Sequence, residues 1–100
     1  MKTLVIHREA IAELDAAMSW YEAQHKGLGL ELHAEVRNVM DEIKHAPDVG
    51  TRYKNTYFRF RRTNRFPYLV YYLEHNETVW IAAIAHGRRR PDYWRRRRPE

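Results

Sequence analysis

The chain has 100 residues, 44% of them hydrophobic, and no cysteine. This length suits one small domain, and the lack of cysteine excludes disulfides and thiolate metal sites. No run of about 18 apolar residues occurs, which excludes a transmembrane helix, and the apolar run at the N-terminus is too short for a signal peptide. We therefore expect a single cytoplasmic domain with no contact to a membrane.

The net charge of +5 is unevenly distributed along the chain. Residues 1–50 contain 5 Lys or Arg and 9 Asp or Glu, a balance of −4, whereas residues 51–100 contain 13 and 4, a balance of +9. This asymmetry predicts that an acidic or polyanionic partner meets the C-terminal half.

The N-terminal half predicts a strand and two helices. Thr3–His7 is short, β-branched and apolar, as in a strand. Apolar residues then follow helical spacing from Arg8 to about His25 and again over Leu28–Ala46, before Pro47. Because the connection between the two helices is short and contains glycine, we expect them to lie antiparallel.

The C-terminal half predicts three strands, at Tyr57–Arg62, Tyr68–Glu74 and Thr78–Ala85. The element order is then β-α-α-β-β-β. It indicates an α+β fold, with the helical hairpin packed on one face of a small, largely antiparallel sheet. We expect residues 1–94 to form this domain and residues 95–100 to form a basic tail.

The alternation in "YFRFRR" predicts which side chains are buried. If Phe58 and Phe60 face the helices, Arg59 and Arg61 project from the opposite face beside Tyr57, where they either contact phosphates and bases or are only solvated. The residues expected to be buried between the helices and the sheet are Leu14, Met18, Val36, Ile43, Phe60, Val70 and Ile81.

The six histidines predict no metal site, because no two are spaced i, i+4 and no carboxylate motif accompanies them. His86 stands at the end of an apolar strand, where it is either a general acid or base or a structural donor. Nucleotide-binding glycine motifs and a nucleophile elbow are absent from the sequence, so we expect no cofactor.

The stretch "HGRRRPDYWRRRR" ends the chain's basic half. Two adjacent aromatic residues in a solvated tail would expose apolar area, so we expect Tyr93 or Trp94 to pack back on the domain and hold Arg88–Arg90 beside the sheet. Arg95–Arg98 are expected to be mobile, because neighbouring guanidinium groups repel one another.

The order of these motifs resembles the RelE/ParE superfamily of type II toxins. The similarity extends from "AIAELDAAMSWYE" through "GLGLELHAEV" and "IKHAPDVG" to the end of the basic stretch, and "RFPYLVYY" with "AHGRRRPDYW" is its most specific part. The resemblance implies a toxin that a cognate antitoxin neutralises within a hetero-oligomer. ParE-like members inhibit DNA gyrase by binding, whereas RelE-like members cleave mRNA on the ribosome.

If the chain is a ribonuclease, the resemblance assigns catalysis to Arg59, Arg61, His86, Arg89 and Tyr93. The residues expected to contact a partner are Tyr57, Arg59, Arg61, Arg88, Arg89, Arg90 and Trp94.

Two departures favour the ParE-like branch. The lysine pair of RelE-like enzymes is absent, and arginine is a poor substitute in proton transfer because its pKa exceeds about 12. Tyr68 also stands where RelE-like enzymes carry an arginine. A third interpretation, which rests on charge alone, is a non-toxic basic module that binds nucleic acid.

Overall fold

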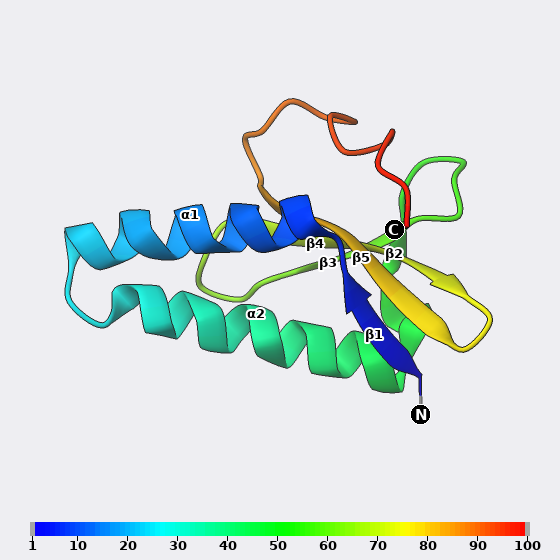
Figure 1. Cartoon of the computed structure of the whole chain (residues 1–100), viewed down its shortest axis with the longest axis horizontal. Coiled ribbons are helices and arrows are strands. Elements are labelled where there is room, and N and C mark those ends of the chain that lie inside the picture. Colours follow the sequence, from blue (N-terminus) through cyan, green and yellow to red (C-terminus); the bar gives the residue numbers. More distant parts are fainter. Residues whose placement is uncertain (1, 100) are drawn as a thin grey trace.

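The computed structural model describes residues 2–99, which form two helices packed against a five-stranded sheet (Figure 1). The elements are β1 (Thr3–Ile6), α1 (Arg8–Gln24), α2 (Leu28–His45), the 3-10 turn η1 (Pro47–Val49), β2 (Thr51–Arg52), β3 (Arg59–Arg62), β4 (Tyr68–His75) and β5 (Thr78–His86). The strand order is β1-β5-β4-β3-β2. Only the pairing of β1 with β5 is parallel, so the expected α+β fold with a largely antiparallel sheet is confirmed.

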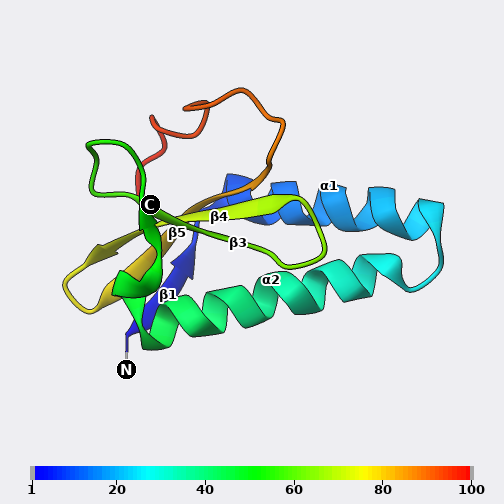
Figure 2. The same cartoon turned by 180° about the vertical axis from the view of Figure 1, so that it is seen from behind.

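The two helices form the expected antiparallel hairpin, which both views display (Figures 1 and 2). α1 begins after His7, whose imidazole Nδ1 accepts a hydrogen bond from the Glu9 amide at 3.1 Å. The connection turns at Gly27, which has a φ of 89°. Among the described residues, neither helix is long and apolar enough to cross a membrane.

The first core lies between the helices and one face of the sheet. Its strand residues include Val70, Tyr72 and Ile81, and α2 contributes Val36 and Ile43, all fully buried. The predicted burial of Leu14 is also confirmed, and Met18 is partly buried against the same core.

The prediction for Phe60 is wrong, because the sheet has a second core on its other face. Phe60 pairs in register with Tyr71, which faces this second core, whereas Arg61 pairs with Val70 of the first core. Phe58 also packs in the second core. Arg59 and Arg61 therefore lie on the helix-covered side of β3, the opposite of the predicted orientation.

Candidate functional site

The second core is closed by the C-terminal segment, residues 87–98, which folds back beside the β2–β3 loop (orange to red in Figures 1 and 2). The Trp94 side chain is only 1% exposed. Its ring centroid lies 4.3 Å from that of Tyr71, 4.8 Å from Phe58 and 5.2 Å from Tyr53. The predicted docking of Trp94 is confirmed. Because its side chain is almost completely buried, the indole stabilises the C-terminal segment from inside the protein.

A turn at Asp92 joins the C-terminal segment to the β2–β3 loop. Asp92 has a φ of 70°, a left-handed conformation that aspartate adopts more readily than most residues. Its carboxylate accepts hydrogen bonds from the Tyr53 hydroxyl and, at 3.1 Å, from Lys54 Nζ. These two hydrogen bonds lower the pKa of Asp92 below its usual value, and the bond from Tyr53 has the larger effect.

A largely buried carboxylate on α1 holds the segment at a second point. Glu13 accepts hydrogen bonds from the Tyr93 hydroxyl at 2.6 Å and from Arg97 Nη2 at 2.9 Å and Nη1 at 3.2 Å. The side chains of Glu13 and Arg97 are 12% and 11% exposed. The expectation that Arg95–Arg98 are mobile is therefore wrong for Arg97. We call Glu13, Tyr93 and Arg97 the Glu13 clamp.

The Glu13 clamp also completes the edge of β5. β1 pairs with β5 only as far as Ile81, so the next backbone groups of β5 lack a strand on that side. Arg97 Nη1 donates to the Ala82 carbonyl at 2.9 Å, and the Ile84 amide donates to Glu13 at 3.0 Å. Buried backbone groups need such partners, so the clamp replaces hydrogen bonds that a longer β1 would make.

His86, Arg89 and Tyr93 lie close together beside α1. His86 and Arg89 line a hollow of about 310 Å³ with Tyr68. The His86 ring packs edge-on against Tyr68, its Nδ1 accepts from the Arg88 amide at 3.0 Å, and Arg89 stacks over the Tyr93 ring at 4.0 Å. Burial raises the pKa of Tyr93 well above its usual value, and the hydrogen bond to Glu13 adds a smaller increase.

Arg59 and Arg61 do not join this group. Arg59 Nη1 donates to the Gly50 carbonyl at 2.8 Å, and Arg61 Nη2 lies 3.4 Å from a carboxylate oxygen of Glu42 on α2. β4 separates β3 from β5 in the sheet. The two arginines therefore fasten the η1 turn and α2 to the sheet, on the face that the helices cover.

The residues predicted to contact a partner differ in exposure. Tyr57 is 83% exposed, and Arg88, Arg89 and Arg90 are exposed. Sequence reasoning missed Glu13, Asp92 and Tyr53. In the sequence, Glu13 is one of several acidic residues of α1, and only the fold places it beside β5. In the described part of the chain, no group of His, Asp or Glu side chains is arranged to hold a metal ion.

A family model described as "ParE toxin of type II toxin-antitoxin system, parDE" matches residues 4–91. The chain belongs to the ParE toxin family. The toxin of a type II system has a cognate antitoxin as its partner, and the expected ParE-like assignment is confirmed.

A solved structure supports the ParE fold. The chain is similar to one from the "Chromosomal ParDE TA system from P. aeruginosa", with a TM-score of 0.66 and 20% sequence identity. The alignment covers 86% of this chain and 96% of that one. No curated protein matches the chain in sequence.

Proposed function

We propose that this ParE-family toxin inhibits DNA gyrase by binding it, without catalysing a reaction, and that its antitoxin neutralises it in a hetero-oligomer. One observation carries the proposal against the ribonuclease alternative. The five residues that RNA cleavage would use lie in two separate groups, and the functional groups of Arg59, Arg61, Arg89 and Tyr93 each contact another part of the protein.

A ribonuclease that uses the RNA 2′-hydroxyl as nucleophile needs a base and an acid within hydrogen-bond reach of one phosphate. The Tyr93 hydroxyl donates a hydrogen bond to Glu13, and its raised pKa disfavours proton release. Arg59 and Arg61 lie on the helix-covered side of β3. His86 and Arg89 share one hollow, and an arginine contributes charge but little proton transfer. This arrangement favours a toxin that inhibits its target by binding over one that cleaves RNA.

The helical hairpin offers apolar anchors for the antitoxin. Ile11 and Trp20 on α1 are 46% and 59% exposed, and Leu30 on α2 is 68% exposed. Buried apolar and aromatic anchors supply most of the affinity of protein interfaces, whereas exposed ion pairs contribute only about 0–1 kcal/mol each. We infer that the antitoxin covers one or more of these apolar side chains and that its acidic residues contact the exposed Arg88 and Arg89.

The target is tested with two parallel assays, one on the purified toxin and one in cells that express it. We expect inhibition of DNA supercoiling by gyrase and its reversal by the antitoxin. Primer extension on cellular mRNA after toxin induction is expected to show no new ends. Cuts at fixed codon positions that His86→Ala abolishes, with supercoiling unaffected, would refute the gyrase proposal and support ribonuclease activity.

A further inference from the structure

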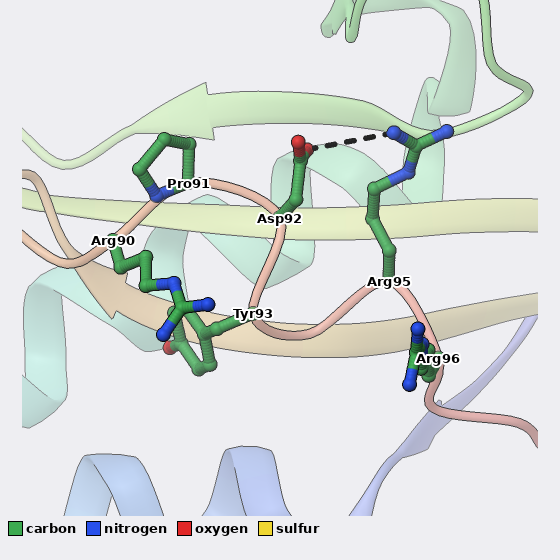
Figure 3. A pocket seen from close by; sticks show the side chains of 6 residues that line it. All are labelled: Arg90, Pro91, Asp92, Tyr93, Arg95 and Arg96. Atoms are coloured by element: carbon green, nitrogen blue, oxygen red, sulfur yellow. Dashed lines mark ion pairs between the residues drawn. The ribbon is translucent and has the colours of Figure 1, made fainter.

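Three arginines of the C-terminal segment surround an open hollow of about 650 Å³ (Figure 3). Its lining consists of Arg90, Pro91, Asp92, Tyr93, Arg95 and Arg96. Figure 3 shows Arg95 directed toward Asp92, with Arg90 and Arg96 on opposite sides of this pair. We call this feature the arginine hollow.

The charge of the arginine hollow is only partly neutralised from within. Arg90 and Arg96 are exposed, and their guanidinium groups make no hydrogen bond or ion pair with the residues that the structure describes. Asp92, the acidic residue of the lining, already binds Tyr53 and Lys54, and Arg95 Nη1 lies 3.7 Å from it. The hollow therefore presents an excess of positive charge to the solvent.

The lining favours a polyanion over an acidic protein. An interface with a protein needs apolar or aromatic anchors at its centre. Pro91 is the one aliphatic residue of the lining, and the exposed apolar side chains of the protein lie on other elements. Guanidinium groups match phosphate oxygens in geometry as well as charge, and binding to backbone phosphates requires no apolar anchor.

The aromatic residues of the segment favour a duplex over a single strand. Proteins bind single-stranded nucleic acid by stacking bases on exposed aromatic rings. The Trp94 side chain is only 1% exposed. The guanidinium of Arg89 lies 4.0 Å and that of Arg97 5.2 Å from the centroid of the Tyr93 ring, so neither aromatic ring is free to receive a base.

We propose that the arginine hollow binds the backbone phosphates of double-stranded DNA, independently of base sequence. This binding requires no gyrase and stands apart from the proposed target. Each neutralised phosphate contributes a slope of about −0.9 to log K against log salt, so phosphate contacts by all three arginines predict a slope of about −2.7. Affinity then falls roughly 40-fold between about 50 and 200 mM salt.

The test is fluorescence anisotropy of a short labelled duplex of mixed sequence, titrated with the full chain at several salt concentrations. Arg90→Ala and Arg96→Ala are each expected to weaken binding and to reduce the slope by about 0.9. The control is Arg37→Ala, which removes the same charge from an exposed position on α2. It is expected to leave affinity and slope nearly unchanged, and all three variants should keep the parent melting temperature.

Equal losses in Arg37→Ala and Arg90→Ala would overturn the proposal, because attraction would then depend on total charge alone. Tighter binding of one strand of the same oligonucleotide would overturn it in favour of base stacking. Failure to bind the duplex, together with Arg90-dependent binding of a polyglutamate peptide, would indicate an acidic protein partner. Because gyrase is absent from this assay, a failed supercoiling experiment leaves its result unaffected.

Discussion

Glu13→Ala tests the structural role of the Glu13 clamp. The substitution removes the acceptor of the Tyr93 hydroxyl, the Arg97 guanidinium and the Ile84 amide at once. Alanine keeps the helix propensity of α1, so the expected effect comes from the lost contacts. We expect the C-terminal segment to detach from α1 at this end and the domain to lose stability.

The magnitude follows from burial. Removing one partner of a buried ion pair costs about 3–5 kcal/mol, and both side chains of this pair are nearly nine-tenths buried. Arg97 lies in the last part of the chain and can turn into solvent, which favours the lower end. The Ile84 amide is fixed in β5 and stays without its acceptor. We therefore expect a loss of about 3 kcal/mol, or a fall in melting temperature of roughly 12–24 °C for a domain of this size.

The measurement is thermal unfolding followed by far-ultraviolet circular dichroism, with Glu9→Ala as the matched control. Glu9 lies one turn earlier on α1, 3.9 Å from Arg97 Nε, and is 58% exposed. Its removal is expected to cost about 1 kcal/mol or less. Arg97→Ala combined with Glu13→Ala should cost clearly less than the sum of the single changes. A Glu13→Ala variant that melts within about 4 °C of the parent would show that the clamp contributes little.

Three further outcomes are expected. Trp94→Ala should destabilise the domain by about 3–5 kcal/mol in urea unfolding, whereas the more exposed Trp20→Ala should change little, and equal effects would contradict the second core. Val36→Asp places an unpaired charge at a fully buried position and should yield no cooperatively folded protein. A thermal unfolding curve like that of the parent would show that Val36 does not face the core. Because the pKa of Tyr93 is raised, the folded state retains a proton that the unfolded chain loses above about pH 10, so stability should fall as the pH rises past this value. In urea midpoints measured against pH, Tyr93→Phe should flatten this decline and Tyr57→Phe should not. Identical profiles for the two variants would refute the attribution of the decline to Tyr93.

The helices and long strands were predictable because periodicity is a property of neighbouring residues. The expected helix over Leu28–Ala46 matches α2 at Leu28–His45. β2 was not predicted, since its two residues carry no period. The candidate site was predicted in part: His86, Arg89 and Tyr93 lie together, while Arg59 and Arg61 lie two strands away.

Alternation showed that Phe60 and Arg61 point to opposite faces, but it could not say which face the helices cover. Both faces of this sheet carry a core, and the second is completed by Trp94, which returns to the sheet from the C-terminal segment. Arg97 is a similar case. In the sequence, Arg97 cannot be distinguished from Arg95, Arg96 and Arg98. The fold nevertheless brings it to the carboxylate of Glu13, 84 residues away. Local pattern determines the elements, whereas the burial of a charge depends on contacts between distant residues, which only the tertiary structure decides.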